Sequence, residues 1–260
     1  GQITEVIMSN VVFMVNIKNE SVPTRVVPYE YSINSWRKWC DKNDCQLFVL
    51  DEYIFDSDYL RPNWYKLYVF DLLENSGIKY EQILVADCDT VVHPDCPNFF
   101  ELSDNKFCAV HNDGSYDWVC RSYENYSKHL FEGFEFSIWE YFNSGFLIMN
   151  KNHKQFYQDI IKFYFENRDL IVNLQDTFGV GTDQPVINFF VHKEDVELKL
   201  LPYRFNMQDM FRKEILHDDM LFTKIGWVYH FNAIPNNVDS QLTTYWMKKT
   251  YEYFHGGKND

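Results

Sequence analysis

Short apolar runs that alternate with amphipathic stretches are the feature that most constrains the fold of this chain. Residues 11–15 and 83–86 are uninterrupted apolar runs, which is typical of strands that are buried on both faces of a sheet. The full pattern predicts strands at 11–15, 46–50, 83–86, 107–110 and 145–149, and helices at 29–39, 64–74, 153–166 and 183–190. Strands that alternate with helices predict an α/β fold, in which an open, mostly parallel central sheet has helices on both faces.

The sequence shows no boundary between domains. No internal repeat and no linker rich in Gly, Ser or Pro divides it, so we expect a single domain over residues 1–260. No window approaches the roughly 18 continuous apolar residues of a membrane span, and the first residues lack the basic-then-apolar pattern of an export signal. The six cysteines form no C-x-x-C pair, which argues against a zinc site and favours free thiols. We therefore expect a cytoplasmic protein without a transmembrane segment, in the host cytoplasm if the protein is viral.

A pair of carboxylates follows one of the buried strands. Asp87 and Asp89 come directly after residues 83–86, and ligands of open α/β sheets bind at the carboxyl ends of the strands. Two carboxylates spaced by one residue offer a hard cation two oxygen ligands, which predicts a metal site, although a helix cap or turn is the simpler alternative. Asp56 and Asp58 have the same spacing, but they lie in a polar stretch that we interpret as a solvated loop.

The net charge of the chain limits its partners. The sequence has 38 acidic and 24 basic residues, a formal net charge of −14, which argues against a nucleic-acid-binding groove. An acidic pocket can still hold an anion if a divalent cation lies between the two.

Several short motifs, in their order along the chain, resemble the donor-site core of glycosyltransferase family 8. They are Lys66-Leu67, residues 82–92 with Asp87-Cys88-Asp89, residues 99–102, Asn143-Ser144-Gly145, Asp183-Gln184 and residues 226–231 with His230. With the strand at 11–15 they span most of the chain. The abundance of Asn, Tyr and Phe is also similar to that of glycosyltransferases from large algal viruses. The resemblance implies a GT-A (Rossmann-like) fold and the transfer of a hexose or deoxyhexose from a UDP-sugar to a glycan or protein, with retention.

The resemblance also implies a metal centre. Asp87, Asp89 and His230 would bind Mn²⁺ or Mg²⁺, and a ligand set of imidazole and carboxylates favours Mn²⁺. The alternative for His230 is a packed core histidine.

The same resemblance assigns the donor-binding residues. Val15 and Asn16 would form the wall beside the uridine, and Lys66 would reach the nucleotide-sugar unless it is a solvated helix lysine. Asn143 and Ser144 would face the donor sugar or the acceptor.

Two further residues would act on the donor sugar. Asp183 would accept hydrogen bonds from sugar hydroxyls, and Gln184 would lie beside the anomeric carbon. Asp183 or Thr182 is also the expected cap of the following helix. Gly145 would allow a close approach of the backbone, or it would mark a bulge.

One motif departs from the family pattern. A glycine and then a lysine that contacts the β-phosphate usually follow the histidine, and residues 231–237 contain neither. Lys248, Lys249 and Arg204 are the candidates to replace that lysine. If the enzyme instead inverts the configuration, Asp113 or Asp117 would be the base.

Two other classes of protein stay open at this stage. One is a catalytically inactive module that binds carbohydrate, although an intact metal site would have no use in it. The other is a metal-dependent phosphohydrolase or nucleotidyltransferase. Those enzymes need a nucleophile or a Gly-rich phosphate loop near the first strand, and residues 15–19 provide neither.

Overall fold

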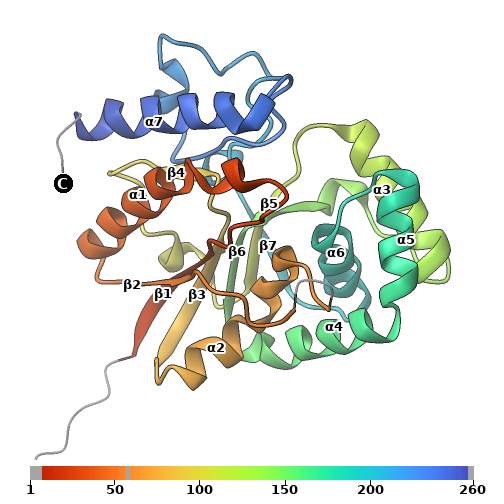
Figure 1. The fold of residues 1–260 in the computed structure, drawn as a ribbon. Helices are drawn as coiled ribbons and strands as arrows, with labels where there is room; N and C mark the ends of the chain where they lie inside the picture. The colour runs from red at the N-terminus through yellow and green to blue at the C-terminus, as the bar shows by residue number, and fades with distance from the viewer. Residues whose placement is uncertain (1–7, 57–58, 257–260) are drawn as a thin grey trace, which may run out of the picture.

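A six-stranded sheet in the order β2-β1-β3-β6-β5-β7 forms the centre of the computed structural model, which describes residues 8–56 and 59–256 (Figure 1). Its strands are β1 (Ser9–Val15), β2 (Gln46–Leu50), β3 (Tyr80–Ala86), β5 (Phe107–His111), β6 (Phe142–Asn150) and β7 (Leu198–Leu201). β1 pairs in parallel with β2 and β3, and β5 with β7, whereas β6 is antiparallel to both of its neighbours. The predicted mostly parallel α/β sheet is confirmed.

Alternate side chains of β1 enter two separate cores. Val11 and Phe13 belong to the core on one face of the sheet, and Val12 and Met14 belong to the core on the other face. All four side chains are fully buried, which explains why the strand reads as a continuous apolar run.

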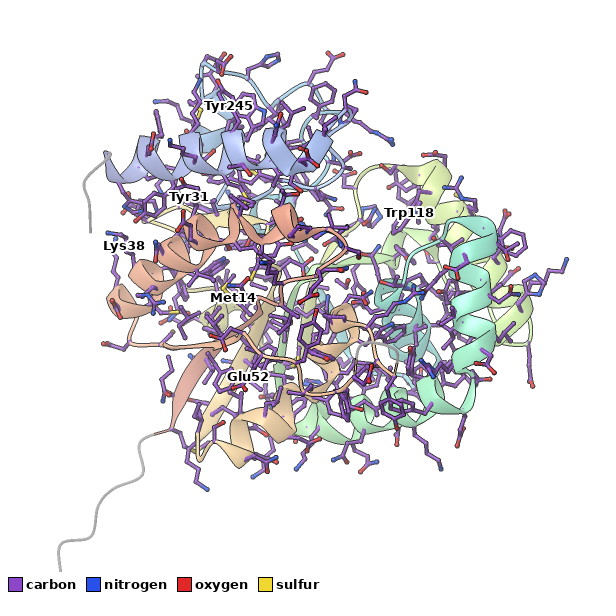
Figure 2. The ribbon with its side chains drawn as sticks, in the orientation of Figure 1. Met14, Tyr31, Lys38, Glu52, Trp118 and Tyr245 are labelled. Carbon is purple, nitrogen blue, oxygen red and sulfur yellow. The ribbon has the colours of Figure 1, made fainter. Side chains whose placement is uncertain are left out.

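Helices cover both faces of the sheet. α1 (Tyr29–Lys42) packs on the face that carries Met14, and Figure 2 shows the side chains that fill the space between them. The other face is covered by α2 (Val69–Asn75), α3 (Tyr116–Leu130), α4 (Lys154–Glu166), α5 (Arg168–Phe178) and α6 (Asp183–Lys193).

A two-stranded sheet lies beside the central one. β4 (Thr90–Val92) pairs antiparallel with β8 (Val228–His230), so the segment just after β3 lies against the strand that carries His230. α7 (Gln241–His255) packs against this small sheet through a core that includes Val91, Tyr229 and Met247. This pairing joins two segments about 140 positions apart in the sequence.

The structure also departs from the sequence prediction. The predicted helix at 64–74 is a 3₁₀ helix over Pro62–Tyr68 followed by α2, and the prediction missed α3, α5, α7 and β7. Thr182 is the N-cap residue of α6, which is one of the two predicted positions, but its side chain makes no capping hydrogen bond. Asp58 and the first seven residues lie outside the described residues. The single domain over 1–260 stays a prediction.

Across residues 8–56 and 59–256, no helix is both long enough and apolar enough to cross a bilayer. The cytoplasmic location stays a prediction.

Candidate metal centre and active site

The turn of residues 87–89 joins β3 to β4, and its backbone is fixed from two sides. The backbone N–H of Asp87 donates to the carbonyl of Gly145 on β6 (3.0 Å). The hydroxyl of Thr90 donates to the carbonyl of Asp87 (2.7 Å) and accepts the indole N–H of Trp36 on α1 (3.0 Å). The turn leads into a strand, so the alternative of a helix cap is wrong for these carboxylates.

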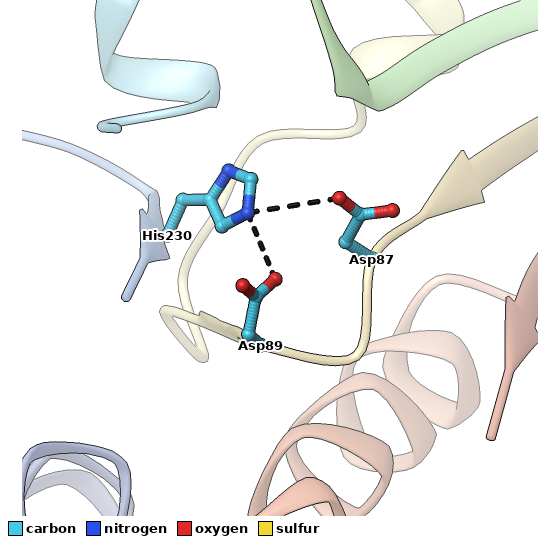
Figure 3. Close-up of side chains that lie close together, drawn as sticks. All are labelled: Asp87, Asp89 and His230. Carbon is cyan, nitrogen blue, oxygen red and sulfur yellow. Dashed lines mark ion pairs between the residues drawn. The ribbon is translucent and has the colours of Figure 1, made fainter. Parts of the chain in front are cut away.

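Asp87, Asp89 and His230 converge at this turn, as Figure 3 shows. Thr90 pairs with His230 across β4 and β8, which brings the imidazole over the two carboxylates. His230 Nε2 lies 2.8 Å from Asp89 Oδ1 and 3.7 Å from Asp87 Oδ2. One ligand atom from each residue falls within 4.8 Å of the others, which is the spacing a single cation needs.

The chemistry of these donors fits a divalent cation. Asp89 Oδ1 is buried, and its neighbour among the described residues is Nε2 of His230 at 2.8 Å. A buried carboxylate is costly unless a cation or a protonated partner balances its charge. The set of two carboxylates and one imidazole suits Mn²⁺ better than Mg²⁺.

Burial and the neighbouring charges shift the pKa values of all three groups. Burial raises the pKa of Asp87 above its usual value, and the neighbouring Asp89 and Asp183 act in the same direction against the lowering effect of Lys66. Burial also disfavours the charged form of Asp89, but the attraction of His230 outweighs it and lowers the pKa. For His230, burial lowers the pKa and the attraction of Asp89 more than compensates, so the net shift is upward. The shifts of Asp89 and His230 favour an ionised carboxylate beside a protonated imidazole.

Gly145 allows these side chains to approach one another. A Cβ at this position would lie 2.6 Å from Cε1 of His230 and 2.8 Å from Oδ2 of Asp87, closer than real Cβ contacts. The glycine is therefore explained by the space that the site needs. The pairing of β6 with β5 also shifts its register between Asn143 and Ile148, so both sequence interpretations of Gly145 have support.

Lys66 points into the site from the 3₁₀ helix Pro62–Tyr68. Its Nζ lies 2.9 Å from Asp183 Oδ2 and 3.4 Å from Asp87 Oδ1, and it is buried. Burial lowers its pKa, but the two carboxylates outweigh burial and hold the ammonium charged. The interpretation as a solvated helix lysine is wrong.

The start of α6 contacts the start of β6. The hydroxyl of Ser144 donates to Asp183 Oδ2 (3.2 Å), and the backbone N–H of Ser144 donates to Gln184 Oε1 (2.9 Å). The other end of the Gln184 amide donates to Asn112 Oδ1 (3.3 Å). Asp183 is thus held by Lys66 and Ser144, and Gln184 is buried with both ends of its amide engaged.

The sequence prediction missed two buried amides of the site. Asn112 follows β5, and it accepts hydrogen bonds from both Gln184 and Asn143. Asn206 lies beside His230, with 3.0 Å between Asn206 Oδ1 and His230 Nδ1. Neither stands in a motif with a recognisable spacing, so only the fold reveals them.

A cavity of about 1130 Å³ opens above the carboxylates. Its wall includes Asp87, Asp89, Lys66, Ser144, Asp183 and Val15. The described cavity wall does not include Asn16, whose backbone N–H donates to the carbonyl of Leu50 (2.8 Å). His230, Asn143 and Gln184 are buried and are not part of the described wall; His230 contacts Asp89 of the wall and Gln184 contacts Ser144.

Three cationic side chains line this cavity. They are Arg25, Arg61 and Lys66. The candidates from the sequence lie elsewhere: Lys248 is exposed on α7, Lys249 pairs with Asp218, and Arg204 lines a separate cavity of about 380 Å³. Placing the missing cation on Lys248, Lys249 or Arg204 was therefore wrong.

The remaining candidate acids lie outside the metal group. Asp113 and Asp117 are exposed beside α3, and Asp117 pairs with Arg212 at 4.0 Å. Asp56 is exposed in an irregular segment, as predicted, and it also lines the rim of the large cavity.

Comparisons with known proteins agree with this geometry. A model of the family described as glycosyl transferase family 8 matches residues 25–235. A search of curated proteins finds no match.

Two solved structures share the fold. One is a glycosyltransferase involved in the glycosylation of the major capsid of PBCV-1, with a TM-score of 0.59 and 9% identity over 92% of this chain and 99% of that chain. The other is the galactosyltransferase LgtC in complex with donor and acceptor sugar analogues, with a TM-score of 0.56 and 14% identity over 96% of each chain. At these identities the likeness shows the fold, which is the GT-A fold that the sequence predicts.

Proposed function

The chain belongs to glycosyltransferase family 8, because the family model matches residues 25–235, and we propose that it transfers a hexose or deoxyhexose from a UDP-sugar to a glycan or protein. The observation that carries the proposal is the convergence of Asp87, Asp89 and His230 beneath a large cavity that Lys66, Arg25 and Arg61 also line. We take the whole of residues 1–260 to be one catalytic domain.

The carboxylates and the imidazole would hold a divalent cation, and Mn²⁺ fits this mixed set of ligands best. The chemistry that a cation supplies in such a site is positive charge on the departing nucleotide diphosphate. Lys66 adds a fixed cation to the same wall, because its two carboxylate neighbours keep it protonated. Together these charges favour an anionic donor in a strongly acidic protein.

Arg25 is the best candidate for a second contact to the diphosphate. Among the cations of the wall, Lys66 is paired with Asp183 and Asp87, and Arg61 donates to Gln175 (3.2 Å). No ion pair joins Arg25 to a described residue, and it is exposed at the cavity. Arg25, Tyr29 and Asp89 line the same cavity.

The arrangement supports retention of the anomeric configuration. The Asp183 carboxylate is held by Lys66 and Ser144, which makes it a poor nucleophile, and an amide such as Gln184 is a weak one. A front-face attack, with the leaving phosphate as the base, needs no protein nucleophile. Inversion would need a free carboxylate near the acceptor, and the exposed Asp113 and Asp117 lie outside the group of residues that converge here.

Calorimetry with UDP tests the proposal directly. UDP should bind in Mn²⁺ and lose most of its affinity in EDTA, and occupancy at a hundred times the dissociation constant should stabilise the fold by about 2.7 kcal/mol. Equal affinity for UDP in Mn²⁺ and in EDTA would contradict a metal-bridged donor. Release of UDP from a panel of UDP-sugars then separates an enzyme from an inactive binding module, which would bind the donor without cleaving it.

A further inference from the structure

A row of side-chain amides runs from the metal group toward Gln184. His230 Nδ1 lies 3.0 Å from Asn206 Oδ1, and Asn206 Nδ2 donates to Asn143 Oδ1 at 3.0 Å. Asn143 Nδ2 then donates to Asn112 Oδ1 at 3.3 Å, and all four side chains are buried. A buried row of this kind has a direction, because each amide must present its oxygen to a donor and its nitrogen to an acceptor.

Backbone groups fix that direction independently of the amides. The backbone N–H of Gly145 donates to Asn143 Oδ1 (2.8 Å), and a backbone N–H is never an acceptor, so this atom of Asn143 is the oxygen. Asn206 must therefore turn its NH₂ group toward Asn143 and its oxygen toward His230. At the other end, Asn112 Nδ2 donates to the carbonyl of Gly114 (2.9 Å), which fixes the same direction.

The direction of the row decides where His230 carries its proton. An amide oxygen accepts only, so Nδ1 of His230 must be the protonated nitrogen and must donate to Asn206. The lone pair of the neutral imidazole then lies on Nε2, the atom 2.8 Å from Asp89 Oδ1. A lone pair that faces a carboxylate oxygen is repelled by it unless a metal cation or a proton lies between them.

The opposite tautomer would prevent Nε2 of His230 from binding a metal. A proton on Nε2 would donate to Asp89 Oδ1 at 2.8 Å, and no lone pair would remain for a metal. The tautomer is therefore decided by two acceptors, because Asn206 Oδ1 favours a proton on Nδ1 and Asp89 Oδ1 favours one on Nε2.

We propose that Asn206 is a positioning residue that holds His230 as the Nδ1–H tautomer and so keeps Nε2 available to the divalent cation. The proposal rests on the proposed function in that it assumes a cation at Asp87, Asp89 and His230. Metal-ligating histidines commonly donate their second nitrogen to such a partner, and loss of the partner typically weakens metal binding about 10- to 100-fold.

Local structure places Asn206 for this role. The residue directly follows the 3₁₀ helix Tyr203–Phe205. The next residue, Met207, donates its backbone N–H to Val228 and accepts from the backbone N–H of His230, so the segment runs along β8. Both ends of the Asn206 amide are used by His230 and Asn143, and the side chain has no other hydrogen bond among the described residues.

The first test compares Mn²⁺ binding by variants. Free Mn²⁺ is measured by electron paramagnetic resonance during titration of the protein in saturating UDP. Asn206→Ala should bind Mn²⁺ about 10- to 100-fold more weakly. Asn206→Asp should recover only part of that loss, because its carboxylate also accepts from Nδ1–H but places its second oxygen against Asn143 Oδ1, where Asn206 donates. Asn150→Ala is the matched control, since Asn150 is equally buried and hydrogen-bonded but lies at the opposite end of β6.

The second test reads the tautomer without any metal. In ¹⁵N-histidine-labelled, metal-free protein at alkaline pH, the His230 signals are those that disappear in His230→Gln. They should show a protonated Nδ1 in the wild type and a shift toward a protonated Nε2 in Asn206→Ala. The Asn150→Ala variant should keep the wild-type signals.

The outcomes separate this proposal from the proposed function. A wild-type protein with a protonated Nε2, or an Asn206→Ala variant that binds Mn²⁺ as well as Asn150→Ala does, overturns the role of Asn206. A wild-type protein that has the Nδ1–H tautomer but binds no Mn²⁺ contradicts the metal site itself.

Discussion

Replacement of Gly145 by alanine should disable the metal centre through a single methyl group. The Cβ would meet three atoms of the site: Cε1 of His230 at 2.6 Å, and Oδ1 of Asn143 and Oδ2 of Asp87, both at 2.8 Å. Ordinary van der Waals contact begins at 3.4 Å, so these groups must retreat by about 0.6–0.8 Å.

The size of this displacement sets the expected effect. Metal–ligand distances tolerate only about 0.2 Å of variation, so a shift of this size removes at least one ligand from reach. Mn²⁺ affinity should fall by more than about tenfold, and transfer should fall by about 100-fold, as expected for a misplacement approaching 1 Å. Overpacking of the strand should also lower the free energy of unfolding by about 1–3 kcal/mol.

The measurement pairs Mn²⁺ titration with urea denaturation of the metal-free protein. Gly133→Ala is the control, because Gly133 has a φ of +80° and an added Cβ would meet nothing within 4 Å. That variant should lose about 1–2 kcal/mol from backbone strain while its Mn²⁺ affinity stays unchanged. If Gly145→Ala kept the Mn²⁺ affinity of the wild type, the crowding argument would be wrong, whatever its stability.

Three more outcomes test the site. Asp87→Asn should abolish transfer without loss of stability in the metal-free protein, because the raised pKa of Asp87 means that its charge is unfavourable there. Asp89→Asn should abolish transfer and also lower the melting temperature, because His230 lowers the pKa of Asp89. Equal stability effects of the two variants in thermal denaturation would refute the distinction. The raised pKa of His230 means that a proton competes with the metal, so Mn²⁺ affinity measured by calorimetry should fall about tenfold per pH unit below that pKa. The stability of the metal-free protein should change in the opposite direction, because the ion pair of protonated His230 with Asp89 stabilises the fold at low pH and is lost as the pH rises through the pKa of His230. A Mn²⁺ affinity that stays flat below pH 6.5 would exclude competition between the proton and the metal. Arg25→Ala should weaken UDP binding in Mn²⁺ by about tenfold and UMP binding much less, since a single exposed charge contact to phosphate contributes about 1–2 kcal/mol. The surface control Arg121→Ala should leave the affinities for UDP and UMP unchanged. An equal loss of affinity for UDP and UMP would show that Arg25 does not contact the diphosphate.

The sequence predicted the centre of the fold because the signal there is strong. The apolar runs of β1 and β3 are buried on both faces of the sheet, so polar residues are excluded from them and the pattern is easy to recognise. Helices α3 and α5 were missed although each has one buried face, because polar side chains such as Ser122 on α3 and Gln175 on α5 interrupt the apolar pattern of that face. α7 was missed for a related reason, since it buries only part of one side against the small sheet.

The sequence predicted those residues of the site that belong to recognisable motifs. Asp87 and Asp89 follow a strand, and His230 lies on a strand that pairs with the next one, so the structure brings the predicted ligands together. Arg25 could not be predicted, because a lone arginine in a short 3₁₀ helix has no signal until the cavity is known. Asn206 could not be predicted either, because its role depends on the direction of hydrogen bonds that only the folded chain defines.

The charge of the site explains how an acidic protein with a net charge of −14 can bind an anion. Asp87, Asp89 and Asp183 bring three negative charges together, and Lys66 balances one of them. The remaining two carboxylates would make the metal-free site repel a diphosphate. Burial raises the pKa of Asp87 and the neighbouring Asp89 adds to the shift, while Asp89 also raises the pKa of His230. Under the proposed function, a divalent cation would cancel both charges, and Arg25 at the rim of the cavity would then add net attraction for the donor. Donor binding would therefore be conditional on the metal, because without the cation the same carboxylates would exclude the nucleotide.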